Sequence, residues 1–395
     1  MASSAPIVVA GHVCLDIIPA FPPRAAASLG ELLKPGSLVQ VGAATISTGG
    51  AVANVGVALH RLGVAVRLAG KVGADAFGDA VRGVLESAGK GLSEGMTRRG
   101  DVATSYTVVV NPPGVDRVFL HCPGANDTFD VDDLPDAVLH GSALLYFGYP
   151  PLMRSVYSDG GERMRAIFER ARALGVATSL DMSQPDPESD AGRVDWRAWL
   201  TRVLPAVDLF LPSYDELLLM LERPRFEAMR RNEEVETPDP AVLKGLADEL
   251  IARGAAVVAI KLGSAGLYLQ TTGDRERLRA VMGLVGDVDR WRGRRLYAPC
   301  FEVELVGTTG SGDCTIAGFL AGLVRGAGPE EVVRGAVAVG ACNVEAADAT
   351  SGVWAWGEVA ARIASGWRSR PASGAFAGWA EAGPAGVRRG PGDGD

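Results

Sequence analysis

The segment Val306-Gly-Thr-Thr-Gly-Ser-Gly-Asp-Cys314 carries residue types that can bind and transfer a phosphoryl group. A β-rich stretch at 301–306 leads into this glycine-rich turn, and a helical pattern follows it. The backbone N–H groups of Gly310, Ser311 and Gly312 would then converge at a helix N-terminus, where unpaired donors and the helix dipole attract an anion. The segment therefore predicts an anion hole at this turn.

Asp313 follows the turn directly and would lie in the first turn of the expected helix. A carboxylate beside a bound phosphate can accept the proton of an attacking hydroxyl, and a positioned base typically contributes about 10²–10⁴ in rate. The same residues also fit a plain N-cap with a tight turn. Taken alone, the segment leaves both interpretations open.

A second informative segment spans residues 47–63. Gly49 and Gly50 open a helix-like pattern that closes at Gly63, and Asn54 lies one turn in, where its amide can hydrogen-bond a polyol. The alternative is a helix of small residues packed tightly on a sheet.

Several other kinds of site are excluded. There is no GxxxxGK[ST], HExxH or GxSxG motif, and the dinucleotide fingerprint has only a near miss at Gly310, which lacks its third glycine. Four scattered histidines give a Ser/His triad little support. The five cysteines are widely spaced and form no CxxC pair, which argues against a zinc ribbon or a disulfide framework and favours a reduced, cytoplasmic setting.

Charge and hydropathy exclude two classes of partner. The 395 residues carry a net charge of −8, so the chain has no basic footprint for nucleic acid. No run of eighteen apolar residues is present, so we expect no membrane span.

The elements that must position these residues alternate between strand-like and helix-like patterns. Short apolar runs of buried-strand length lie at 7–10, 65–69, 143–147, 177–181, 207–211 and 257–260. Amphipathic stretches separate several of them, and the one at 164–174 is ended by Gly175. This order predicts an α/β fold with a mostly parallel sheet covered by helices.

Four other regions depart from this pattern. Residues 104–110 and 116–122 are β-rich and flank an Asn-Pro-Pro-Gly turn, which predicts a hairpin that is either a small lid or peripheral. Charged stretches at 222–236 and 273–295 are expected to be surface loops, and a contact surface for a partner or an anionic ligand is the alternative. The Gly/Pro/Ala-rich residues 371–395 are expected to form a disordered tail.

Together, the two glycine segments resemble the signatures of the ribokinase-like (PfkB) carbohydrate kinases. Gly50 and Gly310 are 260 positions apart, in the order and spacing of that family. Further landmarks are similar to family motifs, and they begin at Gly11, Gly70, Pro123 and Lys261. The resemblance covers residues 5–368, and it implies a three-layer αβα sandwich over residues 1–370 with a small β lid drawn from about 13–46 and 104–122.

The resemblance also implies a role for each matching residue. Asp313 would be the base, and the turn at Gly310, Ser311 and Gly312 would be the anion hole. The acceptor site would be lined by Asp16, Gly49, Gly50 and Asn54. The nucleotide would lie near Lys261, Gly263, Gly266 and Ser213. Glu216 would support Mg²⁺ through water. Simpler roles compete with three of these: a turn cap for Asp16, a solvated helix position for Glu216 and a surface position for Lys261.

The implied reaction is ATP-dependent phosphorylation of a sugar or polyol hydroxyl, with ATP and Mg²⁺ as cofactors and lid closure excluding water. A nucleoside kinase of the same superfamily and a non-catalytic sugar or nucleotide sensor are the alternatives. Two positions depart from the family pattern. Ser213 replaces the Asn of an N-x-x-E motif, and Gly307 replaces an Asp that helps form a monovalent-cation site, which puts potassium activation in doubt. A homodimer through the lid is possible by analogy.

Overall fold

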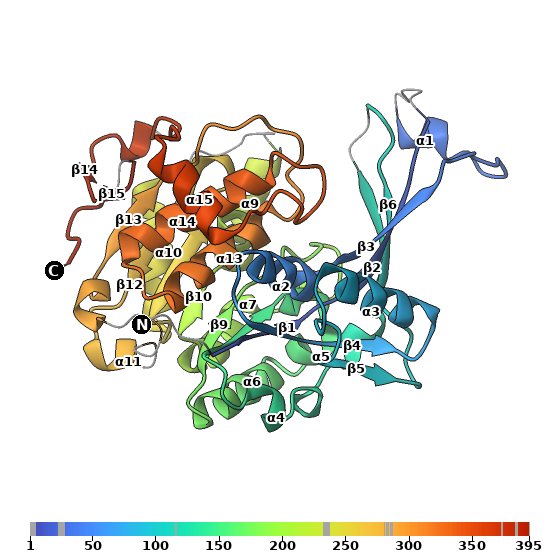
Figure 1. Ribbon diagram of the computed structural model, residues 1–395, viewed down its shortest axis with the longest axis horizontal. Coiled ribbons are helices and arrows are strands. Elements are labelled where there is room, and N and C mark those ends of the chain that lie inside the picture. Colours follow the sequence, from blue (N-terminus) through green and yellow to red (C-terminus); the bar gives the residue numbers. More distant parts are fainter. Residues whose placement is uncertain are drawn as a thin grey trace.

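The computed structural model describes residues 5–22, 28–114, 117–231, 238–279, 281, 284, 287–372, 374–383 and 386–394. Two sheets organise these residues. The larger has eleven strands in the order β14-β15-β13-β12-β11-β10-β9-β8-β1-β4-β5 (Figure 1). In chain order these strands are β1 (Ile7–Gly11), β4 (Val66–Gly73), β5 (Met96–Arg99), β8 (Leu144–Gly148), β9 (Ala177–Leu180), β10 (Leu209–Phe210), β11 (Val257–Lys261), β12 (Leu267–Thr271), β13 (Arg295–Ala298), β14 (Ala380–Glu381) and β15 (Arg388–Arg389).

The seven strands from β5 to β11 pair in parallel, whereas the pairs from β11 to β14 are antiparallel. The expected strands therefore appear close to their predicted positions, and the prediction of a mostly parallel sheet is confirmed. Parallel pairing places the carboxyl ends of β8, β9, β10 and β11 along one edge, where α/β folds bind their ligands.

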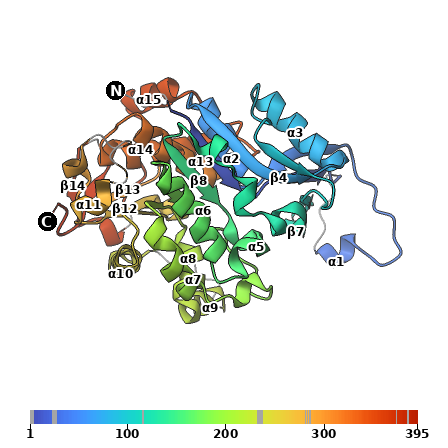
Figure 2. The same cartoon turned by 90° about the horizontal axis from the view of Figure 1, so that it is seen from below.

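Helices cover both faces of this sheet (Figure 2). One face carries α2 (Ala51–Arg61), α3 (Ala76–Ala88), α13 (Ser311–Val324), α14 (Pro329–Asn343) and α15 (Trp356–Ala364). The other carries α5 (Arg154–Tyr157), α6 (Glu162–Ala173), α7 (Trp196–Val203), α8 (Tyr214–Leu221), α9 (Arg223–Arg231) and α10 (Pro240–Ala252). The helices α1 (Leu29–Leu32), α4 (Asp136–Leu139) and α11 (Arg275–Arg279) are short.

Strand periodicity explains this layering. Alternate residues of one strand point to opposite faces of a sheet. Along β1, Ile7 and Val9 belong to the hydrophobic core beneath α2 and α13, whereas Val8 and Ala10 belong to the core beneath α6 and α8. The central strands are thus apolar on both sides, which is why they were visible in the sequence as continuous apolar runs.

The smaller sheet has the order β3-β2-β6-β7 and projects from the body (Figure 1). Its strands are β2 (Cys14–Pro19), β3 (Ala44–Gly49), β6 (Tyr106–Val110) and β7 (Val118–Cys122). β6 and β7 form the expected antiparallel hairpin, and β2 pairs in parallel with β6. The small sheet therefore joins two segments that are far apart in the sequence.

Only His12 and Val13 separate β1 of the large sheet from β2 of the small one. The backbone N–H of His12 donates to the carbonyl oxygen of Gly148 at 3.2 Å. The side chain of Asn126 both accepts from the N–H of Val13 and donates to its carbonyl oxygen, at 3.2 and 3.0 Å. The link is therefore held by the body of the protein.

The expectation of a disordered tail is wrong for the part of 371–395 that the structure describes. Here β15 pairs with β13, and it pairs with β14 in turn. Phe376 is fully buried and stacks on Tyr297 with ring centroids 3.9 Å apart, and Asp393 accepts a hydrogen bond from Arg294 at 3.0 Å. A few apolar and charged side chains anchor the segment despite its glycine and proline content.

The prediction of a surface loop at 222–236 is also wrong, because the first part of this stretch forms α9. Residues 232–236 lie outside the described ranges. Phe226 is buried and anchors this helix to the core. In the stretch at 273–295, α11 and the buried Trp291 likewise pack against the body. Among the described residues, no helix is both long and apolar enough to cross a membrane.

Candidate active site

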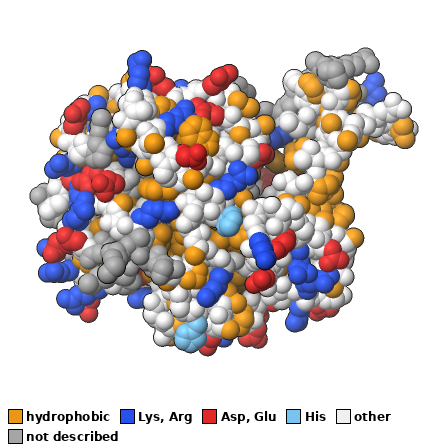
Figure 3. All heavy atoms as spheres, viewed as in Figure 1, with side chains coloured by type: hydrophobic (Ala, Val, Ile, Leu, Met, Phe, Trp, Pro, Cys, Tyr) orange, Lys and Arg blue, Asp and Glu red, His pale blue; other side chains and the backbone are white. Residues whose placement is uncertain are grey.

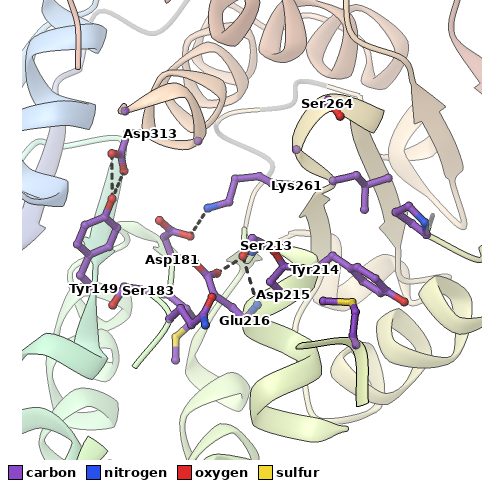
Figure 4. A pocket seen from close by; sticks show the side chains of 18 residues that line it. Tyr149, Asp181, Ser183, Ser213, Tyr214, Asp215, Glu216, Lys261, Ser264 and Asp313 are labelled. Atoms are coloured by element: carbon purple, nitrogen blue, oxygen red, sulfur yellow. Dashed lines mark hydrogen bonds and ion pairs between the residues drawn. The ribbon is translucent and has the colours of Figure 1, made fainter. Parts of the chain in front are cut away.

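The predicted site residues converge where the carboxyl ends of the parallel strands face the N-terminus of α13 (Figure 4). A cavity of about 580 Å³ opens there. Its lining includes several predicted residues, namely Ser213, Glu216, Lys261, Gly263, Gly310, Gly312 and Asp313, together with Tyr149 and Asp181, which the sequence analysis did not select. The chain thus brings residues separated by more than 160 positions into one site.

Asp313 lies in the first turn of α13 and is buried. Its Oδ2 accepts a hydrogen bond from Nδ2 of Asn54 at 2.9 Å, which connects the two glycine segments directly. The hydroxyl of Tyr149 lies 2.8 Å from Oδ1 and 2.9 Å from Oδ2. Burial raises the pKa of Asp313 above its usual range, although the hydrogen bonds from Asn54 and Tyr149 oppose that rise. A carboxylate with a raised pKa is suited to accept a proton near neutral pH.

The predicted anion turn precedes this carboxylate. Gly310 has a φ of 71° and begins α13 as its N-cap. Within the described residues, the N–H groups of Gly310 and Gly312 have no hydrogen-bond partner, whereas the N–H of Ser311 donates to the carbonyl oxygen of Thr308 at 3.3 Å. Two of the three predicted donors are therefore free to bind an anion, and the third is held by a long hydrogen bond.

Lys261 ends β11, and its Nζ lies 2.6 Å from Oδ1 of Asp181. Burial raises the pKa of Asp181, the charge of Lys261 opposes that rise, and the charge of Glu216 adds to it. Burial disfavours the charged form of Lys261, but the carboxylates of Asp181 and Glu216 outweigh it and raise its pKa. Lys261 is therefore a largely buried cation among carboxylates, with its side chain 12% exposed, rather than a surface residue.

Ser213 and Glu216 begin α8 and form a reciprocal capping box. The Ser213 N–H donates to Oε2 of Glu216 at 2.7 Å, and the Glu216 N–H donates to Oγ of Ser213 at 3.3 Å. Such a box satisfies N–H groups that the helix leaves unpaired. It also holds the Glu216 carboxylate, which is buried, at the wall of the cavity.

Gly263 and Gly266 lie in the turn between β11 and β12 and line a second cavity of about 320 Å³. Its walls are largely apolar and include Phe301, Val337 and Val344. Lys261, Gly263 and Gly312 line both cavities, so the two lie next to each other at the anion turn.

The predicted acceptor residues lie on the other side of Asp313, against the small sheet. Asp16 on β2 pairs with Ser47 on β3, and a Cβ at Gly49 would lie 2.4 Å from Oδ2 of Asp16. Burial raises the pKa of Asp16, while hydrogen bonds from Cys14 and Thr107 oppose the rise. Gly50 precedes α2 and lies against the ring of His12, and Asn54 projects from α2 to Asp313 as described.

His12 is a buried residue beside these that the sequence analysis passed over. Its ring centroid is 5.3 Å from that of His121 and 6.2 Å from that of Tyr149. Neither ring nitrogen has a hydrogen-bond partner among the described residues. Burial, followed by the neighbouring His121, lowers the pKa of His12 from 6.5 to about 3.

The stability of the folded state should therefore depend on His12 in mild acid. Below pH 6.5 the unfolded chain binds a proton at this residue that the folded chain does not, so stability falls between pH 6.5 and about 3. At pH 5 the loss relative to pH 7.5 is about 2 kcal/mol. His12→Phe should make the measured drop in unfolding free energy between these pH values smaller by that amount. Urea denaturation at both pH values tests this, with exposed His140→Phe as the control; equal drops in wild type and His12→Phe would refute it.

Tyr149 and Asp181 are the other residues that sequence reasoning missed. Asp181 directly follows β9, so its position at the carboxyl end of an expected parallel strand was a usable signal. Tyr149 follows β8 with a φ of 67° and is the only non-glycine residue with positive φ in the described part of the chain. Nothing in the sequence signals that conformation for a tyrosine.

Comparison with known proteins gives a consistent result. Residues 7–356 match the model of the pfkB family carbohydrate kinases. A curated relative from Archaeoglobus fulgidus, described as an uncharacterized sugar kinase, is 25% identical over 265 residues, which cover 67% of this chain and 85% of that protein.

Solved structures with the same fold include three sugar kinases. The ribokinase of Arabidopsis thaliana complexed with ribose and ATP has a TM-score of 0.66 and 19% identity, covering 91% of this chain and 98% of that one. The fructokinase of Xylella fastidiosa with bound ATP has a TM-score of 0.65 and 20% identity, with coverage of 91% and 98%. The ribokinase of Thermotoga maritima has a TM-score of 0.63 and 19% identity, with coverage of 91% and 99%.

The small sheet beside a mostly parallel αβα sandwich is thus the ribokinase-like fold. With the family model matching nearly the whole chain, the protein belongs to the pfkB family of carbohydrate kinases and is an ATP-dependent carbohydrate kinase.

Proposed function

We propose that the protein transfers the γ-phosphoryl group of ATP to a hydroxyl of a sugar or sugar-like polyol. The observation that carries this is the position of Asp313, which is buried at the N-terminus of α13, next to the free amides of Gly310 and Gly312, and hydrogen-bonded to Asn54. One carboxylate therefore faces both an anion-binding turn and the segment that resembles a polyol site. The related ribokinase solved with ribose and ATP and the fructokinase solved with ATP support the same class of reaction.

The two adjacent cavities suit ATP. The largely apolar 320 Å³ cavity beside Phe301 and Val337 would take the base and ribose, and Gly263 and Gly266 would line its turn. The phosphates would then extend past Lys261 to the turn at Gly310. There the ammonium group of Lys261 and the free amides offer opposite charge and donors to an anion.

The carboxylates of the larger cavity fit Mg²⁺. Mg²⁺ keeps several waters and is usually bound by one or two carboxylates together with substrate phosphates. Asp181 and Glu216 provide two carboxylates at the wall, and no cluster of three or more ligating side chains occurs among the described residues. When bound, Mg²⁺ neutralises phosphate charge; Asp181 and Glu216 would hold it through water. Because Gly307 stands where the family pattern has an Asp that helps form a monovalent-cation site, a monovalent-cation requirement has no support.

In this mechanism, three groups of residues have three separate roles. Asp16 and Asn54 would orient the acceptor hydroxyls, and Asp313 would take the proton of the reacting one. The turn at Gly310–Gly312 would bind the phosphoryl group while it moves. The small sheet would close over the acceptor to exclude water, which would otherwise compete as the acceptor.

A nucleoside kinase is the second candidate, because aromatic rings lie beside the predicted acceptor residues. His12, His121 and Tyr149 form such a group, and rings of this kind can stack on a nucleobase. Both functions share the base and the anion turn, so only the acceptor distinguishes them.

An ADP-release screen over pentoses, hexoses, ketoses, sugar acids and nucleosides tests the proposal. We expect turnover with a sugar or polyol; turnover restricted to nucleosides would assign the second candidate. Calorimetry with the same compounds distinguishes both kinase functions from a non-catalytic sensor. Binding without turnover across the whole panel would reject the kinase function and support the sensor.

We further propose that the small sheet can join two copies of the chain. Figure 3 shows hydrophobic side chains on the projecting sheet. Ile46, Phe119 and Leu120 are 46%, 54% and 56% exposed, and β3 and β7 are the edge strands of this sheet. An apolar surface at an open sheet edge favours strand pairing with a second copy. Besides a second copy of the chain, the partner that we propose is the small-molecule acceptor. We also propose that the protein acts in the cytoplasm.

A further inference from the structure

Tyr149 contacts the proposed base more closely than any other side chain does. Its hydroxyl lies within hydrogen-bond distance of both carboxylate oxygens of Asp313, at 2.8 and 2.9 Å, whereas Asn54 reaches only Oδ2. A tyrosine hydroxyl has one hydrogen to donate, so it can satisfy only one of the two oxygens at a time. Oδ2 therefore has two donors in reach, and Oδ1 has Tyr149 alone.

The backbone of Tyr149 is strained. A non-glycine residue with φ near 67° costs on the order of 1–3 kcal/mol and persists only where its surroundings impose it, often at functional sites. Tyr149 lies between Gly148 at the end of β8 and Pro150 at the start of the 3₁₀ turn η3 (Pro150–Leu152). This conformation directs the ring from the strand end to α13.

We propose, building on the kinase function above, that Tyr149 is a positioning residue that fixes the carboxylate of Asp313 so that Oδ1 receives the proton of the acceptor. As the acceptor hydroxyl approaches Oδ1, the Tyr149 hydrogen moves to Oδ2, where it joins the amide of Asn54. The acceptor O–H bond then breaks and its proton passes to Oδ1. The acceptor oxygen forms a bond to the γ-phosphorus of ATP, and the bridging oxygen leaves with its electron pair on ADP.

The hydrogen-bond donors around Asp313 also affect its pKa, and therefore the pH range over which it can accept a proton. The groups that face it are Asn54 from α2, Tyr149 after β8, Asp181 after β9, Glu216 from α8 and Lys261 from β11. The hydrogen bonds from Asn54 and Tyr149 and the charge of Lys261 lower the pKa of Asp313, against burial and the charge of Glu216, which raise it. Loss of the Tyr149 donor would let that pKa rise further.

The test is Tyr149→Phe, which keeps the ring and removes only the hydroxyl. We expect kcat to fall about 10- to 100-fold, the range expected for loss of one hydrogen bond to a charged group. KM for the acceptor should change less than about threefold. The acid limb of the kcat–pH profile should move to higher pH, because a base with a higher pKa stays protonated over a wider range. A purely structural tyrosine would lower the melting temperature without moving that limb.

Tyr157→Phe is the matched control, since it removes a tyrosine hydroxyl on α5 that makes no contact with Asp313, and its profile should equal that of the wild type. If Tyr149→Phe does not fold, 3,5-difluorotyrosine at position 149 keeps the ring and donates more strongly. It should move the acid limb to lower pH. An unmoved acid limb with unchanged kcat in an active protein overturns the positioning role. Absence of turnover in the wild type over the whole acceptor panel would instead overturn the kinase function, so the two failures are distinguishable.

Discussion

Asp313→Asn should lower kcat by about 10²–10⁴-fold while the protein remains folded, because asparagine has the same shape but cannot take a proton. Its side-chain oxygen can still accept the hydrogen bond from Nδ2 of Asn54, and its amide can pair with the hydroxyl of Tyr149. The buried site therefore loses a charge without leaving a polar group unpaired. The fold should tolerate the change because burial already disfavours that charge.

ADP release at saturating ATP and acceptor measures the loss, and calorimetry with ATP should show binding close to that of the wild type. Asp101→Asn is the control, since Asp101 lies on the surface with only a 3.7 Å ion pair to Arg99. Unchanged kcat in Asp313→Asn would falsify the assignment of the base.

Gly310→Ala should lower kcat on the order of 10²–10³-fold, as removal of a donor from an anion hole typically does. The φ of 71° disfavours any side chain, and a Cβ at this position would lie 2.3 Å from the carbonyl oxygen of Ala349. That neighbour is backbone and cannot rotate away, so the turn itself must shift. The amides of Gly310 and Gly312 would then leave the positions from which they face the cavity.

Gly83→Ala on α3 is the control, because a Cβ there meets nothing within 4 Å, and it should leave kcat and stability close to those of the wild type. Should Gly310→Ala unfold, Gly312→Ala provides the second measurement. Its Cβ would lie an ordinary 3.7 Å from Lys261, so the fold should hold while the methyl group obstructs the approach of the phosphates. Full activity in both folded variants would show that the turn does not bind the moving group.

Much of the fold follows from the sequence because its central strands are apolar on both faces. The run at 143–147 became β8 and the run at 257–260 became β11, each within one residue at either end. Hydropathy could not show which residues the tail buries. Phe376 and Asp393 anchor it through specific contacts with Tyr297, Trp379 and Arg294, which an average over composition does not reveal.

The candidate site was predictable to the extent that its residues lie in glycine-marked turns. Gly50 and Gly310 mark helix starts, so Asn54 and Asp313 could be placed one turn in, and the structure brings them together at 2.9 Å. The residue types suggested a base at Asp313 and a polyol contact at Asn54, the family resemblance favoured these roles over plain structural ones, and both roles are proposals. Tyr149 could not be found in this way, because its place depends on a backbone conformation that tyrosine rarely adopts.

The two-residue link between β1 and β2 couples the large and small sheets mechanically. His12 and Val13 are each bonded to the body, so any rotation of the small sheet must begin within four residues of Asp16 in the chain. Occupation of the acceptor site would thus be transmitted along β2 to the outer tip of the small sheet. A pair of fluorescent labels, one at that tip and one on α6, would report acceptor affinity by energy transfer even in a protein that cannot turn over.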